Sequence, residues 1–272
     1  MKSEFEKITT VMTLATPLRI LHLFPQSMGL YGDRGNAIAL LRRCALRGIP
    51  ARLDTTESVE SLSFGEIDIV IIGGGADKDQ QRVASRLAAI DKKAFEDAIE
   101  EGLVVLAVCG GYQFLGLRYT TASGETIPGL GIFPAVTESG HGRRLIGNVE
   151  VVASRDIGGR LVGFENHGGR TWILGREASP LGFVRYGHGN NGVDGTEGCR
   201  VRNCFGTYLH GPVLPNNPSF ADALVSLALS RRSNKFLRLA PLEDSVEEAA
   251  RYRFLQRCKS SKRIASRLGL EF

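Results

Sequence analysis

The residues best suited to chemistry lie where a buried apolar segment runs directly into a glycine pair. Leu103–Val108 has the sequence LVVLAV, and Cys109, Gly110 and Gly111 follow it. This pattern predicts a strand that turns sharply into a helix, the geometry in which a nucleophile elbow presents its reactive side chain. The helix N-terminus and a nearby base lower the pKa of such a thiol from about 8.5 toward neutrality, which favours the nucleophilic thiolate. A buried structural cysteine is the alternative interpretation.

A cysteine nucleophile needs a base, and the chain has five histidines. His210 follows FGTYL and precedes a Gly-Pro pair, so we expect it, like Cys109, at a strand end beside a tight turn. His167, in GFENHGGR, is a second contender. His22 lies inside the first predicted strand and is expected to be a core histidine with satisfied hydrogen bonds. His141 and His188 lie in glycine-rich loops and are expected to be solvated.

A glycine loop, Gly73–Gly75, follows the β-branched run Ile67–Ile72. Such a loop either cradles a phosphate or offers its backbone N–H groups to an oxyanion. Neither G-x-x-x-x-G-K-[ST] nor a G-x-G-x-x-G after a strand is present, so nucleotide binding has little support. Beside a cysteine turn, the oxyanion role is preferred.

The elements that position these residues alternate between strands and helices. Leu18–Phe24, Ile67–Ile72 and Leu103–Val108 are predicted strands, and helices are predicted from Asn36 onward and over Lys92–Glu101. Predominantly apolar strands of this kind, of which Leu103–Val108 is an unbroken run, are typical of a parallel sheet covered on both faces.

Beyond residue 120 the pattern changes to short strands separated by glycine-rich turns. These strands are predicted near Gly147–Ala153, Leu161–Phe164, Gly182–Tyr186 and Val201–Tyr208. Two helices follow, over Pro218–Arg231 and Asp244–Arg267. We therefore expect a loose lead-in at 1–17, one α/β domain at 18–231 and a helical tail at 232–272.

Composition excludes several classes of protein. The chain has 272 residues, of which 43% are hydrophobic and 23% charged, as in an ordinary globular domain. A net charge of +5 permits an anionic partner but demands none, and no nucleic acid is expected. No apolar run approaches the roughly 18–20 residues of a membrane span. The N-terminus makes a poor signal peptide, so the cytoplasm is the expected compartment.

The five cysteines form no C-x-x-C pair and no histidine lies at ligand spacing from them, so no metal site is expected. A reducing compartment predicts free thiols. They are Cys44, Cys109, Cys199, Cys204 and Cys258.

LAVCGGYQFLG and GTYLHGPVLPNNP together resemble the class I glutamine amidotransferases. In that family the turn has the form C-x-G-x-Q, matched by Cys109, Gly111 and Gln113, and the base comes from a later strand end, matched by His210. FENHGGRT is similar to a motif of the cobyric acid and cobyrinate amidase branch. IIGGGADKDQQ, CGGYQFLG, GLGIF, TESGHGRRLIGN, GFENHGGRT and GTYLHGPVLP occur in the same order in glutaminase subunits of lipid II isoglutaminyl synthases. The similarity covers about residues 18–230.

The resemblance implies a class I amidotransferase-like α/β fold, with an open, mostly parallel sheet flanked by helices and a C-terminal helical appendage. It also implies a mechanism. The Cys109 thiolate attacks the side-chain amide of glutamine, and backbone N–H groups near Gly75 and Gly110 hold the oxyanion. His210 passes a proton to the leaving nitrogen, ammonia departs, and water hydrolyses the glutamyl thioester.

Two further roles follow from the resemblance. Gln113 would contact the substrate, and an arginine in the TES…RLIGN segment would pair with its α-carboxylate, because the planar guanidinium matches a carboxylate. Arg144 is preferred by motif, and the adjacent Arg143 would then be a solvated loop charge.

The chain departs from the class at one position. Many class I enzymes have a glutamate two residues after the histidine, where this chain has Pro212. Either a dyad suffices or another acid orients His210, and Glu165 is available in the sequence. An unoriented imidazole loses part of its rate advantage, so weak activity is expected from the isolated chain.

The resemblance also implies a heterodimer with a Mur-ligase-like synthetase subunit that binds ATP, Mg²⁺ and lipid II. That partner would use ammonia from L-glutamine to amidate the D-glutamate α-carboxylate to D-isoglutamine in peptidoglycan synthesis. No cofactor is expected in this chain, and at most peripheral contact with the inner face of the membrane. The basic tail could touch the partner or anionic lipid, or could simply be a solvated helix.

Three alternatives remain open from sequence. The chain could supply ammonia for cobyrinate-type amidation, it could be a non-catalytic binding module on the same fold, or it could be another cysteine hydrolase such as a peptidase. Intact Cys109, Gln113 and His210 argue against the binding module.

Overall fold

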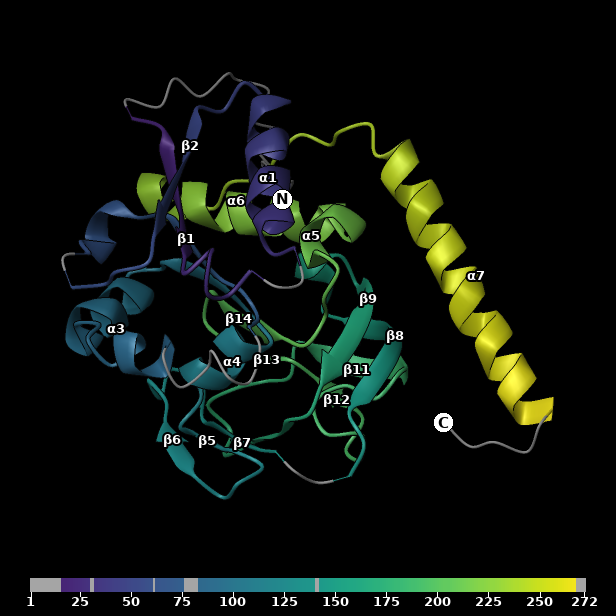
Figure 1. Ribbon diagram of the computed structural model, residues 1–272. Helices are drawn as coiled ribbons and strands as arrows, with labels where there is room; N and C mark the ends of the chain where they lie inside the picture. The colour runs from purple at the N-terminus through teal and green to yellow at the C-terminus, as the bar shows by residue number, and fades with distance from the viewer. Residues whose placement is uncertain (1–15, 30–31, 61, 76–82, 140–141, 268–272) are drawn as a thin grey trace.

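A six-stranded sheet forms the centre of the computed structural model, which describes residues 16–29, 32–60, 62–75, 83–139 and 142–267 (Figure 1). The strand order is β13-β14-β4-β3-β1-β2, and every neighbouring pair is parallel except β13 and β14. These strands are β1 (Leu18–Leu23), β2 (Ala51–Thr56), β3 (Ile69–Ile72), β4 (Val104–Val108), β13 (Cys199–Val201) and β14 (Cys204–Thr207).

Helices cover both faces of this sheet because its central strands are apolar on both sides. Every residue of β3 and β4 is buried, and each buried Val, Leu or Ile side chain stabilises the fold by roughly 1.5–3 kcal/mol. The helices are α1 (Arg34–Ala45), α3 (Lys92–Glu100), α4 (Gly110–Leu115), α5 (Val213–Asn216) and α6 (Pro218–Ser233). Right-handed crossovers from β1 to β2 and from β3 to β4 run in opposite directions along the sheet, which places α1 and α3 on opposite faces.

Two four-stranded sheets are inserted between α4 and β13. One contains β5 (Arg118–Thr120), β6 (Thr126–Pro128), β7 (Ala135–Glu138) and β10 (Arg170–Ile173). The other is antiparallel and contains β8 (Leu145–Ala153), β9 (Arg160–His167), β11 (Gly182–Tyr186) and β12 (Thr196–Glu197). A backbone bridge between Phe164 and His210 joins this antiparallel sheet to the segment after β14.

The C-terminal helix α7 (Ser245–Arg267) runs along the side of the molecule, beside β8 and β9 (Figure 1). Its Arg251 guanidinium donates to the carbonyl of Arg160 in β9, and Cys258 is buried. Within the described residues, no helix combines the length and the apolar character needed to cross a bilayer.

The structure confirms the predicted fold class, with differences in detail. The prediction of one strand over Val201–Tyr208 is wrong, because Arg202 adopts φ +52° and turns the chain between β13 and β14. The edge strand β2 and the β5-β6-β7-β10 sheet were not predicted. The proposed domain limits stay predictions, and residues 1–15 of the lead-in lie outside the described residues.

Candidate active site

Cys109 occupies a strained turn between β4 and α4. Its backbone has φ +51° and ψ −105°, and the side chain is buried. A non-glycine residue held in such a conformation costs roughly 1–3 kcal/mol, and strain of this kind clusters at active sites. The Cys109 N–H donates to the Thr207 carbonyl at 2.8 Å, so the turn is fixed to the end of β14. A Cβ on Gly111 would lie 2.6 Å from the Ile72 carbonyl oxygen, so only glycine allows the turn to approach β3 this closely.

The glycine loop after β3 lies against this turn. Gly111 N–H donates to the Gly73 carbonyl at 3.1 Å, and Gly74 N–H donates to the Asp33 carboxylate at 2.9 Å. In the described part of the chain, the N–H groups of Gly75 and Gly110 have no hydrogen-bond acceptor. Backbone donors left available beside a cysteine are what an oxyanion hole requires.

His210 lies three residues beyond β14, at the same carboxyl edge of the sheet. The prediction that it directly ends the strand is wrong: β14 ends at Thr207, and His210 is held by backbone hydrogen bonds with Phe164 of β9, at 3.2 and 2.7 Å. Burial, followed by the charges of His167 and Arg144, lowers the pKa of His210 to about 3. The imidazole is therefore neutral near pH 7.

Tyr208 connects the cysteine turn to the β9–β10 segment. Its ring stacks on His167 with centroids 3.6 Å apart, and its hydroxyl accepts a hydrogen bond from Gln113 Nε2 at 3.0 Å. The same hydroxyl lies 2.7 Å from Thr171 Oγ1. Burial, with a smaller contribution from Cys109, raises the pKa of Tyr208. Tyr208 thus brings His167 and Gln113 into the surroundings of Cys109.

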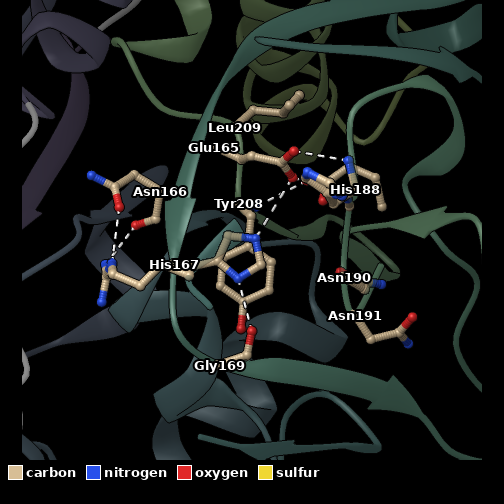
Figure 2. A network of polar contacts seen from close by, with 12 residues as sticks. Glu165, Asn166, His167, Gly169, His188, Asn190, Asn191, Tyr208 and Leu209 are labelled. Atoms are coloured by element: carbon tan, nitrogen blue, oxygen red, sulfur yellow. Dashed lines mark hydrogen bonds and ion pairs between the residues drawn. The ribbon is translucent and has the colours of Figure 1, made fainter. Parts of the chain in front are cut away.

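Glu165 and His167 form a buried pair beside these groups (Figure 2). The Glu165 carboxylate accepts hydrogen bonds from the N–H groups of His188 and Gly189, at 2.8 and 2.9 Å. It lies 3.7 Å from Nε2 of His167, whose Nδ1 is 2.8 Å from the Gly169 carbonyl. Burial lowers the pKa of His167. These contacts place the Glu165 carboxylate beside His167 and the His188–Gly189 backbone, and a role for this acid in orienting His210 stays a prediction.

Arg144 reaches the same region from the start of β8. Its Nε and Nη2 donate to the side-chain and main-chain oxygens of Asn166, at 3.0 and 2.9 Å, and its charge lowers the pKa of His210. Arg170 Nη2 donates to the Arg143 carbonyl at 2.6 Å and so fixes the backbone next to Arg144. Both Arg143 and Arg144 are exposed.

Of the remaining histidines, His188 joins this cluster through its backbone N–H alone, whereas His22 lies in the core. His22 is buried in β1 as predicted, but its hydrogen bonds are not satisfied, because neither ring nitrogen has a partner within the described residues. The prediction of a solvated His188 is wrong: the residue is half-buried and its N–H binds Glu165. His141 lies outside the described residues. All five cysteines are buried, and no disulfide joins any two of them in the described part of the chain.

A pH dependence of stability follows from the buried His210. The unfolded chain takes up a proton at this histidine as the pH falls through about 6.5, whereas the folded state resists protonation until about 3. Stability is therefore lost as the pH falls between these values, by at most about 1.4 kcal/mol per pH unit. We expect His210→Gln to lose less stability than the wild type between pH 6.5 and 5.0, by roughly 2 kcal/mol or a few degrees in Tm.

Thermal unfolding of both proteins across this pH range measures the difference. His188→Gln is the matched control, because its ring lies on a half-buried loop and its backbone contact to Glu165 is unchanged. Identical pH slopes for wild type and His210→Gln would show that burial of His210 does not disfavour its protonation.

Residues 19–218 match the family model described as the CobB/CobQ-like glutamine amidotransferase domain. The chain belongs to this glutamine amidotransferase family. The assignment agrees with a strained cysteine turn, available backbone donors and a neutral histidine at one edge of a parallel sheet.

Two relatives of this amidotransferase match over most of both chains. The "Lipid II isoglutaminyl synthase (glutamine-hydrolyzing) subunit GatD" of Staphylococcus aureus is 39% identical over 90% of this chain and 98% of the relative. The protein of the same name from Streptococcus pneumoniae is 37% identical over 85% of this chain and 88% of the relative. These matches support the assignment of the chain to the glutamine amidotransferase enzymes.

A solved structure supports the fold alone. The structure of PurLQS from Thermotoga maritima superposes with a TM-score of 0.53 at 15% identity, over 79% of this chain and 99% of the matched chain.

Sequence reasoning missed several residues that the structure places around the amidotransferase site. Asp33 contacts the glycine loop, and Tyr208 contacts Gln113. Glu197 is buried, and its carboxylate accepts hydrogen bonds from Thr207 Oγ1 and from Tyr208 N–H. An acidic residue between two glycines, as in GDRG, is a local signal that could have drawn attention to Asp33.

Proposed function

We propose that this amidotransferase is the glutaminase subunit of a lipid II isoglutaminyl synthase. It hydrolyses L-glutamine and passes ammonia to a Mur-ligase-like synthetase subunit. The observation that carries the proposal is the Cys109 turn, where a strained, buried cysteine lies beside N–H groups that have no acceptor among the described residues. Near end-to-end similarity to GatD proteins supports the choice of acceptor.

The proposed chemistry begins with transfer of the Cys109 thiol proton to neutral His210. The sulfur then bonds to the side-chain amide carbon of glutamine, and the carbonyl oxygen becomes an oxyanion that Gly75 and Gly110 stabilise through their N–H groups. His210 returns the proton to the amide nitrogen, the C–N bond breaks, and ammonia leaves. Water, deprotonated by His210, attacks the thioester, and the C–S bond breaks to release glutamate and the thiol.

A dyad of Cys109 and His210 fits this chain better than a triad with Glu165. The Glu165 carboxylate is committed to the His188–Gly189 backbone and to His167. His167 stacks on Tyr208, and burial lowers its pKa, so its ring lines the site in the neutral form. In this proposal the Glu165–His167 pair shapes the surroundings of His210 without exchanging a proton with substrate.

Arg144 is proposed to bind the α-carboxylate of glutamine, and Gln113 to contact the same substrate. Removal of a charge-assisted hydrogen bond typically costs about 1.5–3 kcal/mol. Arg144→Ala is therefore expected to raise KM for glutamine by roughly 10–100-fold with a much smaller change in kcat, as steady-state ammonia release would show. Arg143→Ala keeps the backbone contact to Arg170 and is the matched control. Equal effects of both substitutions would remove Arg144 from this role.

ATP and Mg²⁺ are proposed to act on the synthetase subunit, which would activate the D-glutamate α-carboxylate of lipid II for attack by ammonia. Because that substrate is anchored in lipid, the complex would meet the membrane only at its cytoplasmic surface. The basic α7 helix is available for contact with the partner or with anionic lipid.

Transfer of label tests this function. The full chain, its synthetase subunit, ATP, lipid II and glutamine labelled with ¹⁵N in the side-chain amide are incubated together. We expect ¹⁵N in the D-isoglutamine of lipid II. Labelled ammonia without labelled lipid II would favour another acceptor, such as a cobyrinate-type acid. No ammonia from the folded complex would favour a non-catalytic binding module.

A further inference from the structure

The segment Gly32–Asn36, which leads into α1, contacts the proposed site although the mechanism gives it no role. Asp33 is the N-cap of α1, yet its side chain makes no capping hydrogen bond to that helix. The carboxylate is 1% exposed and instead accepts the Gly74 N–H at 2.9 Å. A carboxyl group is costly to bury, and burial raises the pKa of Asp33 to about 6. Placing this carboxylate on the glycine loop therefore costs the folded state the free energy of burying it.

Contact between Asp33 and the loop depends on glycine. A Cβ on Gly73 would lie 2.7 Å from Asp33 Oδ2 and 2.1 Å from the Met28 carbonyl oxygen. The carbonyl of Gly73 in turn accepts the Gly111 N–H at 3.1 Å. A continuous path thus runs from Asp33 through the glycine loop to the residue two positions after Cys109.

The same helix start also contacts the segment that follows His210. The Leu214 N–H donates to the buried Asn36 Oδ1 at 2.9 Å. A Cβ on Gly35 would lie 2.4 Å from Cγ of Pro212, so glycine allows close packing there. The start of α1 therefore touches both the loop beside Cys109 and the chain after His210.

We propose that Asp33 is a positioning residue for glutamine hydrolysis. Its carboxylate fixes the Gly73–Gly75 loop against the Cys109 turn, so that Gly75 and Gly110 direct their N–H groups to the same oxyanion. Because the Asp33 carboxylate accepts the Gly74 N–H, it also sets the direction of the next peptide, whose N–H, on Gly75, has no acceptor among the described residues. The inference rests on the proposed function, because it assumes that Cys109 attacks an amide at this turn.

The test compares Asp33→Ala and Asp33→Asn with wild type in the full chain, with the synthetase subunit present. A displacement of about 1 Å at a reacting centre can cost about 10²-fold in rate. We expect Asp33→Ala to lower kcat for ammonia release by about 30–100-fold while KM changes less than about threefold. Asp33→Asn keeps an oxygen acceptor for Gly74 N–H and is expected to recover part of kcat. Alkylation of Cys109 by iodoacetamide, which needs no oxyanion donors, is expected to keep its wild-type rate.

Asp91→Ala is the matched control. Asp91 is also an N-cap aspartate, but its carboxylate accepts from Ala94 N–H of its own helix α3. This variant is expected to lose stability without loss of kcat. A wild-type kcat in folded Asp33→Ala would overturn the proposal, as would a parallel fall of kcat, alkylation rate and Tm in both Asp33 variants. Ammonia release by Cys109→Ala would instead overturn the proposed function, whatever the Asp33 variants do.

Discussion

Replacement of Cys109 by alanine is expected to reduce ammonia release from glutamine by at least about 10⁴-fold. The substitution removes the only atom proposed to bond to the amide carbon, and loss of a nucleophile in a covalent mechanism is among the largest single-residue effects known. We expect the fold to survive, because alanine is smaller than cysteine and the backbone strain at φ +51° is the same for both residues. Steady-state ammonia release by the full chain, with and without the synthetase subunit, measures the loss.

Cys44→Ala is the matched control for this substitution. Cys44 is equally buried, and burial raises the pKa of its thiol to about 12, so it is a poor nucleophile. Activity within a few-fold of wild type is expected. If Cys109→Ala retained substantial activity while folded, the thioester mechanism would be wrong for this chain.

His210→Ala has the second largest expected effect, a loss of about 10³-fold or more in kcat. General acid–base catalysis by one positioned side chain contributes typically 10²–10⁴-fold, and His210 is proposed to act in both halves of the reaction. Because Cys109 and His210 act as a unit, the double variant is expected to be no slower than Cys109→Ala alone. Rates of ammonia release by the wild type, the two single variants and the double variant together form a double-mutant cycle that measures this coupling.

His188→Ala controls for the removal of an imidazole from the same region, since its contact with Glu165 is made by the backbone. If the fold-losses of the two single variants multiplied in the double variant, Cys109 and His210 would act independently. A large loss in His167→Ala with none in His210→Ala would move the base to the other contender.

Prediction from sequence succeeded where the signal is local. The β3 and β4 strands are apolar at every position because both faces of the sheet are covered, so each stands out as an unbroken run. The edge strand β2, with the sequence ARLDTT, is only partly buried and carries no such run. β2 belongs to the sheet because it pairs with β1, and this pairing cannot be recognised from the residues of β2 alone.

The same distinction holds for the site. Cys109 could be found because the strand before it and the glycines after it are adjacent in sequence. Asp33 and Gly74 are 41 residues apart, and Gln113 and Tyr208 are 95 apart, so those contacts exist only in the folded chain. His210 was selected as a strand end, yet it is held by a bridge to β9 that the sequence does not show. The assignments of Arg144 and Gln113 to the substrate stay predictions.

Covalent trapping tests the central claim most directly. The full chain with its synthetase subunit is treated with 6-diazo-5-oxo-L-norleucine, a reactive analogue of glutamine, and the peptides are analysed by mass spectrometry. We predict one equivalent of label on Cys109, prevention by excess L-glutamine, slower labelling in His210→Ala, and none on the other buried thiols. A folded complex that carries no label, or label on Cys44, Cys199, Cys204 or Cys258 instead, would contradict the assignment of Cys109 as the nucleophile.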